Sequence, residues 1–162
     1  MRILLLAATA LLILTANLAG ADDLKRIDLD DPSSLGMQIA ADTKVKVEGK
    51  SSTKITTCWP TSVCLGVVSD LDVENAKLIY RAKVKSDLKE GNAFLEMWAL
   101  LAGGNYFSRG LNLTISGDTD WKTIETPFIF QKGQKPEKVT LNLVINGKGT
   151  VWIDAVTLSK EP

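Results

Sequence analysis

The chain of 162 residues contains no histidine. Histidine is the commonest general base, the central residue of Ser-His-Asp and Cys-His catalytic arrangements, and a frequent ligand of transition metals. Carboxylates remain for acid–base chemistry, and a glycosidase needs two of them about 5 to 10 Å apart. Glu96 and Glu125 are candidates, but each could equally pair with Arg81 or Lys83 on a solvated strand face. We therefore expect a protein that is not an enzyme.

An excess of charge of one sign is also missing, since 19 basic residues stand against 19 acidic ones. Proteins that bind nucleic acid or anionic membrane surfaces carry a basic excess or a basic cluster. The sequence therefore argues against a nucleic-acid partner.

Beyond the first residues, the chain lacks helical periodicity and instead alternates apolar and polar residues in short runs. Such runs, separated by turn residues at near-regular spacing, predict about eight to ten strands in two antiparallel sheets packed as a sandwich. We expect residues 78–85 and 93–101 to be neighbouring strands joined by a turn at 89–92, with a further turn at 146–149. Pro127 should lie at a sheet edge or a bulge. The other expected strands are 26–29, 43–47, 53–58, 63–68, 111–115, 121–130, 139–145 and 150–158, and residues 106–108 form a short segment before 111–115.

The first 21 residues are typical of a secretory signal peptide. Arg2 supplies a positive charge, residues 3–14 form an apolar run broken only by Thr9, and Ala19-Gly20-Ala21 resembles a cleavage site. The alternative is a membrane anchor, but Asn17 and Gly20 interrupt the apolar stretch before it reaches the roughly 20 residues that a span requires. We expect a bacterial protein exported to the periplasm or secreted, with no membrane span after cleavage. Residues 22–162 should form a single domain.

The sequence has only two cysteines, Cys58 and Cys64. Exported proteins meet an oxidising compartment, so these two residues are expected to form a disulfide that closes a short loop. Two buried free thiols are the alternative. A redox role is not expected, because the spacing is not Cys-x-x-Cys.

Four motifs occur in a consistent order along the chain, and the closing motif over residues 147–158 is the most specific of them. They are Gly49-Lys50-x-Ser52, Ile79-Tyr80-Arg81-Ala82, Asp120-Trp121 with Thr126-Pro127-Phe128, and Gly147-x-Gly149-Thr150-Val151-Trp152-Ile153-Asp154-x-Val156-x-Leu158. Over about residues 24–159 the chain resembles the galactose-binding-like jelly roll of secreted carbohydrate-binding modules. It is most similar to stand-alone exported bacterial domains of unassigned function. The resemblance implies an all-β, two-sheet antiparallel sandwich whose ends meet.

The same resemblance implies a structural calcium ion near the two ends of the domain. In such modules an aspartate of the closing motif is a ligand, which corresponds to Asp154. Asp30 and the backbone carbonyl of Lys50 are the nearest equivalents of the other ligands. Calcium requires about six to eight oxygen atoms. The alternative is that Asp154 accepts backbone hydrogen bonds at a bulge where the last strand bends.

A non-catalytic binding module for a glycan or surface polysaccharide is the function that we expect from this fold. A sheet face can present aromatic rings to sugar rings beside polar groups that bind hydroxyl groups. The candidate ligand-binding residues are Arg81, Glu96, Trp98 and Asn142 on the outward register, with Tyr106 in the adjoining loop. Alternatively, Arg81 and Glu96 pair with each other, and the two aromatic residues belong to the core or its rim.

A second function from a different class stays open, because aromatic residues make up only 6% of the chain. In this alternative the sandwich is a structural or protein-interaction domain without a sugar ligand. Its exposed edge or hydrophobic patch would then meet a protein partner.

Overall fold

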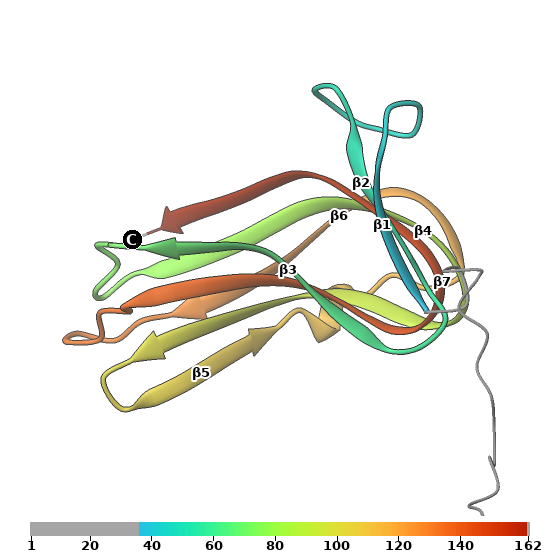
Figure 1. Cartoon of the computed structure of the whole chain (residues 1–162). Coiled ribbons are helices and arrows are strands. Elements are labelled where there is room, and N and C mark those ends of the chain that lie inside the picture. Colours follow the sequence, from blue (N-terminus) through green and yellow to red (C-terminus); the bar gives the residue numbers. More distant parts are fainter. Residues whose placement is uncertain (1–35, 162) are drawn as a thin grey trace, which may run out of the picture.

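The computed structural model describes residues 36–161, which form an almost entirely β-stranded body (Figure 1). The predicted signal peptide, the expected strand at 26–29 and Asp30 lie outside the described residues. The strands are β1 (Met37–Asp42), β2 (Ser52–Thr57), β3 (Thr61–Ser69), β4 (Lys77–Leu101), β5 (Gly104–Arg109), β6 (Asp118–Ile129) and β7 (Lys138–Glu161). One short 3-10 helix, η2 (Leu111–Leu113), follows β5. Within residues 36–161, no helix has the length and apolar character needed to cross a bilayer.

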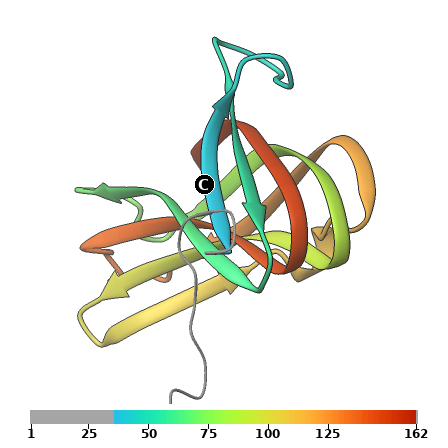
Figure 2. The same ribbon diagram turned by 45° about the vertical axis from the view of Figure 1, so that its right-hand side comes forward.

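Two long strands, β4 and β7, each run through both layers of the sandwich. In the first layer, β3 pairs with the first part of β7, which pairs with the last part of β4, and β5 completes the edge. In the second layer, the order is β1, β2, the last part of β7, the first part of β4, and β6. All pairings are antiparallel. Figure 2 shows the two strands curving together from one layer into the other. The predicted antiparallel β-sandwich is confirmed.

The core lies between the layers and takes every second residue of each long strand. Alternation turns successive side chains to opposite faces, so Leu95, Met97 and Ala99 are buried while their neighbours face outward. The other large, fully buried side chains come from both layers and the loop before β4: Ile55, Val73, Leu78, Tyr80, Val84, Ile115, Phe130, Val139, Leu143 and Ile145. Burial of these apolar surfaces is the main source of stability.

The turns predicted at residues 89–92 and 146–149 are wrong, because both segments are bends inside continuous strands. They lie opposite each other, with Gly91 paired to Gly147 and Leu88 paired to Gly149. A Cβ atom at Gly91 would collide with the carbonyl oxygen of Asn146, and one at Gly147 would collide with that of Glu90. Glycine is needed here for close backbone approach at a bulged bend, and it produces the same sequence signal as a hairpin turn.

Two shorter segments also differ from the sequence prediction, and one prediction about a sheet edge is confirmed. Residues 43–47 form bends rather than a strand, and β1 lies just before them, at 37–42. The expected strand at 111–115 is η2 followed by a single bridge between Ile115 and Ala93. Pro127 is confirmed at a sheet edge, since β6 pairs only with β4.

The two cysteines are separate, exposed thiols, so the predicted disulfide is not formed in the structure. The alternative of two buried free thiols agrees with the structure in that both thiols are free, but both are exposed. The predicted disulfide assumed that residues 58–64 form one short loop. Instead, β2 and β3 lie in different layers, and the segment between them crosses from one layer to the other. Cys58 lies in this crossover, whereas Cys64 lies inside β3 opposite Asn142.

Candidate functional site

The candidate site is the outer face of the first layer, where β7, β4 and β5 lie side by side. Core positions at Leu95 and Met97 turn Glu96 and Trp98 outward. Across the sheet, Glu96 is opposite both Asn142 and Arg109, and Trp98 is opposite Phe107. We call this surface the Glu96 face and define it by five residues: Glu96, Trp98, Phe107, Arg109 and Asn142.

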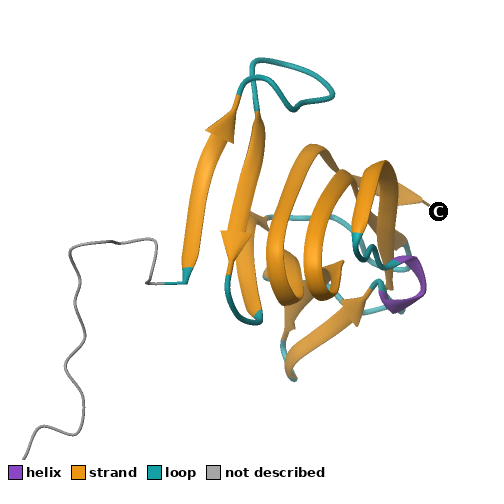
Figure 3. Ribbon diagram, turned by 90° about the vertical axis from the view of Figure 1, so that its right-hand side faces the viewer, coloured by secondary structure: helices purple, strands orange, loops and turns teal. Residues whose placement is uncertain are grey.

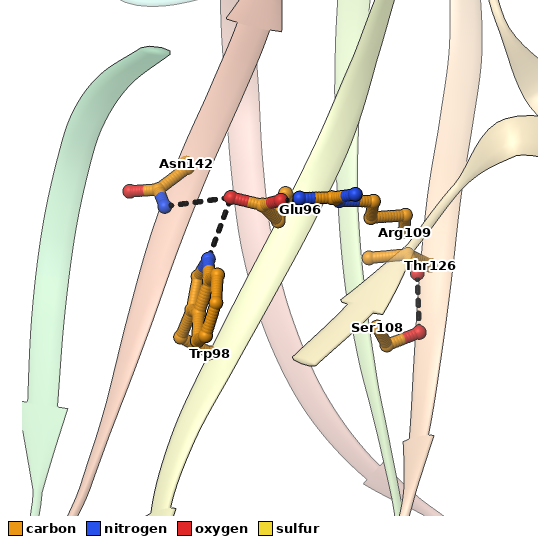
Figure 4. Close-up of polar contacts among 6 residues, drawn as sticks. All are labelled: Glu96, Trp98, Ser108, Arg109, Thr126 and Asn142. Atoms are coloured by element: carbon orange, nitrogen blue, oxygen red, sulfur yellow. Dashed lines mark hydrogen bonds and ion pairs between the residues drawn. The ribbon is translucent and has the colours of Figure 1, made fainter. Parts of the chain in front are cut away.

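The Glu96 carboxylate accepts hydrogen bonds from three side chains on three adjacent strands (Figure 4). The indole Nε1 of Trp98 donates to Oε1 at 2.6 Å, and Nε of Arg109 donates to Oε2 at 2.6 Å. Nδ2 of Asn142 donates to Oε1 at 3.3 Å. This network holds Trp98 and Arg109 in defined orientations, which is the preorganisation that a binding site requires.

Glu96 is buried although it lies on an outer face, since only 5% of the residue is exposed. Burial alone would raise the pKa of Glu96, but the hydrogen bonds from Arg109, Trp98 and Asn142, together with the charge of Arg109, lower it below its ordinary value. Glu96 is therefore ionised at neutral pH and neutralised by Arg109.

An aromatic pair lies beside this network. The ring centroids of Trp98 and Phe107 are 5.1 Å apart, and the ring planes are tilted by 46°. The Arg109 guanidinium lies over the Phe107 ring, 4.6 Å from its centroid. Phe107 is 53% exposed, so much of its surface is open to a ligand.

A shallow hollow of about 390 Å³ opens on the same outer face, next to the network. Phe94, Arg109 and Val144 line it from the sheet, and the segment entering β3 forms its wall through Pro60, Thr61 and Ser62. Its volume is within the range of small-ligand sites. Arg109 therefore borders both the hollow and the aromatic pair.

Of the five residues predicted to bind ligand, the structure brings three together: Glu96, Trp98 and Asn142. Tyr106 lies on the opposite face of β5 from Phe107 and borders a separate hollow of about 170 Å³ with Gly103 and Gln134. Arg81 lies on the outer face of the second layer.

The pairing of Arg81 with Glu96, which the sequence left open, does not occur. Arg81 instead forms an ion pair with Glu125 at 2.7 Å. Glu96 and Glu125 lie on the outer faces of different layers and do not face one another, so they do not form the carboxylate pair of a glycosidase.

Two residues of the Glu96 face, Phe107 and Arg109, were missed by sequence reasoning. A signal was present, because the break at Gly103-Gly104 indicates a tight turn after residues 93–101. A two-residue hairpin loop at Ala102 and Gly103 pairs Leu101 with Gly104. Counting outward from that pair sets Trp98 opposite Phe107 and Glu96 opposite Arg109.

The expected calcium ligands are only partly described, because Asp30 lies outside the described residues. Asp154 accepts backbone N–H groups from Val47 at 2.7 Å, Glu48 at 3.2 Å and Ala155 at 2.8 Å. The carbonyl oxygen of Lys50 accepts a hydrogen bond from the Lys46 ammonium group. Across residues 36–161, no cluster of three or more acidic or cysteine side chains could hold a metal.

Asp154 lies at an irregularity where β7 shifts register against Arg81 and Lys83 of β4. Ala155, the next residue, has φ of 49°. These contacts match the alternative role in which Asp154 accepts backbone hydrogen bonds at a bend. Burial alone would raise the pKa of Asp154, but the three backbone hydrogen bonds lower it.

Comparisons with known proteins find no match for this sequence among family models or curated proteins. Solved structures do match. The CBM22-1 xylan-binding domain of Xyn10C from Paenibacillus barcinonensis superposes with a TM-score of 0.54 at 16% identity, over 77% of this chain and 81% of that one. The chain has the jelly-roll fold of carbohydrate-binding modules.

Two further structures support this assignment of the fold. A family 16 carbohydrate-binding module matches with a TM-score of 0.55 at 14% identity, over 75% of this chain and 84% of that one. The CBM22-1–GH10 modules of Clostridium thermocellum xylanase 10B, complexed with xylohexaose, match at 0.55 and 13% identity. That match covers 79% of this chain and 25% of the larger protein. At these identities the likeness concerns the fold, and the role of the Glu96 face is argued from its own residues.

Proposed function

We propose that this protein is a non-catalytic module that binds a carbohydrate chain on the Glu96 face. The observation that carries the proposal is the contact between the exposed Phe107 ring and the half-buried Trp98 ring, beside a polar network centred on Glu96. Aromatic rings stack on the apolar faces of sugar rings, and Arg109 and Asn142 offer donors to hydroxyl groups. The fold shared with carbohydrate-binding modules supports the same function.

The charge of the Glu96 face favours a neutral glycan over an acidic one. Glu96 and Arg109 are its only ionised residues, and they neutralise each other through a 2.6 Å contact. An anionic ligand would have to compete with the Glu96 carboxylate for Arg109. Binding of a neutral chain should therefore depend little on salt concentration.

The tilt of the aromatic pair favours a single, twisted chain over a crystalline surface. Two rings inclined by 46° cannot both lie flat on one planar surface. They can stack on successive sugar rings of a chain that twists along its length. We expect the protein to bind soluble polysaccharides and oligosaccharides, and not to be retained by a crystalline polymer of the same sugar.

A glycan-array screen of the protein purified after export, followed by titration calorimetry on any positive glycan, tests the proposal. Saturable binding that Trp98→Ala abolishes would support it. Trp121→Ala is the matched control, because Trp121 lies on β6 in the other layer. No saturable binding on the array, or binding that both variants retain, would overturn the proposal.

Export to the periplasm or the medium belongs to the same proposal, because a polysaccharide ligand is met outside the cytoplasm. Cell fractionation with N-terminal sequencing tests both export and cleavage after residue 21. A protein that stays in the cytoplasm with its N-terminus intact would contradict this part.

A structural calcium ion stays a proposal that a chelator tests directly. If Asp154 is a ligand, a chelator should lower the melting temperature of the wild-type protein, and added calcium should restore it. If Asp154 acts only as the acceptor for Val47, Glu48 and Ala155, the melting curve should not change. Asp154→Asn would be destabilising in either case, so the chelator is the deciding measurement.

A further inference from the structure

Among residues 36–161 the sandwich has four edge strands, and three of them carry features that discourage pairing with another strand. β6 contains Pro127, which lacks an N–H donor, together with charged side chains such as Lys122. β3 is bulged between Cys64 and Gly66. β5 ends at Arg109, and Ser108 ties it to β6 through Thr126 and the Pro127 carbonyl oxygen. Prolines, charges, bulges and covered edges are the devices by which native sheets avoid edge-to-edge association.

The fourth edge, β1, has no proline, no basic residue and no bulge, and no other part of residues 36–161 pairs with its outer side. Its sequence, Met-Gln-Ile-Ala-Ala-Asp, has no proline, glycine, lysine or arginine, and its pairing with β2 is regular over six residues. Five of its six residues are exposed. Figure 3 shows β1 at the border of its sheet, and Figure 1 shows the β1–β2 hairpin rising from the body.

The only charge on β1 is already satisfied within the chain. Asp42 accepts backbone hydrogen bonds from Lys44 at 2.9 Å and Val45 at 3.0 Å, and one from the Trp152 indole at 3.0 Å. These hydrogen bonds, those from Val45 and Trp152 first, lower the pKa of Asp42. The rest of the strand is uncharged, so a second uncharged strand meets no electrostatic penalty there.

One face of β1 is apolar and continues the core face of the second layer. Ile39 pairs with Ile55, and Ile55 in turn pairs with Val151, both of which are fully buried. Ile39 itself is 51% exposed and Met37 is 42% exposed. The apolar row therefore runs out of the core and ends at β1, whose outer side pairs with no other strand of residues 36–161.

We propose that β1 pairs with β1 of a second copy of this chain, in antiparallel orientation, so that the two second layers join into one continuous sheet. Residues directly opposite in an antiparallel pair share a face, so a two-fold axis normal to the sheet must pass midway between the two copies of one residue. An axis at Ile39 sets Ile39 opposite its own copy and Met37 opposite Ala41 on the apolar face. This self-complementarity is why the second copy, rather than an unrelated strand, is the occupant.

The register leaves no opposed charges. Gln38 faces Ala40 of the second copy, and Asp42 faces the glycine at position 36. The cross-strand contact between the two isoleucines extends the buried row from Val151 through Ile55 across the dimer. This inference does not depend on the proposed function, because no glycan takes part in it.

Sedimentation equilibrium on the purified protein, over a range of concentrations, provides the first test. The expected result is a reversible equilibrium between one and two chains. Ile39→Lys, which would set two ammonium groups opposite each other, should shift the protein to a monomer without lowering its melting temperature. Ile129→Lys is the matched control, since Ile129 is an exposed isoleucine at the end of edge strand β6 and should leave the dimer intact.

A cysteine scan tests the register. In a background with Cys58→Ser and Cys64→Ser, Ile39→Cys should crosslink two chains on mild oxidation, because directly opposed Cα atoms lie about 4.5–5.5 Å apart. Ala40→Cys should not crosslink, because residue 40 lies opposite residue 38 of the second copy. The two introduced cysteines are therefore two positions apart along the strands. Crosslinking at 40 but not at 39 would overturn the register.

Two outcomes seen with a monomer, and a third seen with a dimer, would overturn the pairing itself. One is a protein that stays monomeric at every concentration, whatever residue stands at position 39. The other is a monomer whose β1 backbone amides are protected from hydrogen exchange, which would show that another segment of the same chain occupies the edge. A dimer that Ile39→Lys leaves unchanged would assign the association to a different surface.

Discussion

Two cross-strand Arg–Glu pairs lie on opposite outer faces of the sandwich, and both involve β4. Arg81 contacts Glu125 at 2.7 Å, and Arg109 contacts Glu96 at 2.6 Å. The arginines are equally exposed, at 44% and 43% of their side-chain surface. The glutamates differ, since Glu125 is 36% exposed and Glu96 only 6%. The same residue types at the same distance therefore have different physical roles.

The difference comes from what surrounds each carboxylate. Glu96 receives donors from Trp98 and Asn142 in addition to Arg109, and these side chains also cover it. Among the described residues, Glu125 has Arg81 as its side-chain partner. A solvated ion pair contributes at most about 1 kcal/mol, whereas a buried carboxylate with several donors is costly to disturb. The first arrangement is a surface ion pair, and the second organises a site.

The largest expected effect is the loss of stability on removing the buried carboxylate. Glu96→Gln would set an amide nitrogen against Arg109 and leave buried donors without a full partner. We expect the free energy of unfolding to fall by about 1–3 kcal/mol, against less than about 1 kcal/mol for Glu125→Gln. Urea denaturation of both variants measures the difference. Equal losses would show that burial does not separate the two pairs.

The next effect concerns ligand binding and compares two adjacent aromatic residues of β5. Phe107→Ala should weaken glycan binding about tenfold, equivalent to about 1.4 kcal/mol. Tyr106→Ala should leave affinity unchanged, because Tyr106 faces away from Trp98. Both residues are about half exposed, so neither change should alter stability strongly. Titration calorimetry with a glycan positive on the array measures the affinity of both variants. A larger loss of affinity for Tyr106→Ala would place the binding site on the opposite face of β5.

A smaller effect should appear in acid. The pKa of Glu96 in the folded state lies below its ordinary value of 4.5. Its ionised form therefore stabilises the fold above pH 4.5, and this contribution is lost as the pH falls through the lower folded-state pKa. The free energy of unfolding should decline less steeply with falling pH in Glu96→Gln than in the wild type. If the free energy of unfolding declines equally steeply with falling pH in both proteins, the lowered pKa of Glu96 would be contradicted.

The smallest effect is expected for Arg81→Ala. Its ion pair is solvated, so stability should change by less than about 1 kcal/mol and glycan affinity should not change. Denaturation and calorimetry under the same conditions check both. A loss of affinity for Arg81→Ala would mean that the second layer also contacts the ligand.

Much of the fold could be predicted because alternation reports which side chains face the core. The core positions of β4 and the last strand, such as Leu95, Met97 and Leu143, follow from period two alone. The pairing could not be predicted, because Gly91 and Gly147 produce the same signal in a bend as in a hairpin turn. As a result, 78–85 and 93–101 were predicted as two strands when they are one.

The candidate site was predicted in part for the same reason. Glu96, Trp98 and Asn142 share an outward register that the sequence shows directly. Phe107 and Arg109 join them only through the β4–β5 pairing, and Tyr106 is excluded by the alternation within β5.

The sequence by itself determined the all-β class, the alternating core and the absence of histidine chemistry, because these depend on residue type and local period. Only the tertiary structure decided that β4 and β7 cross between layers, that Arg81 and Glu96 lie on the outer faces of different layers, and that β1 is an edge strand among residues 36–161. Each of those outcomes depends on which strands lie side by side, and contacts between residues distant in the chain leave no local periodic signal.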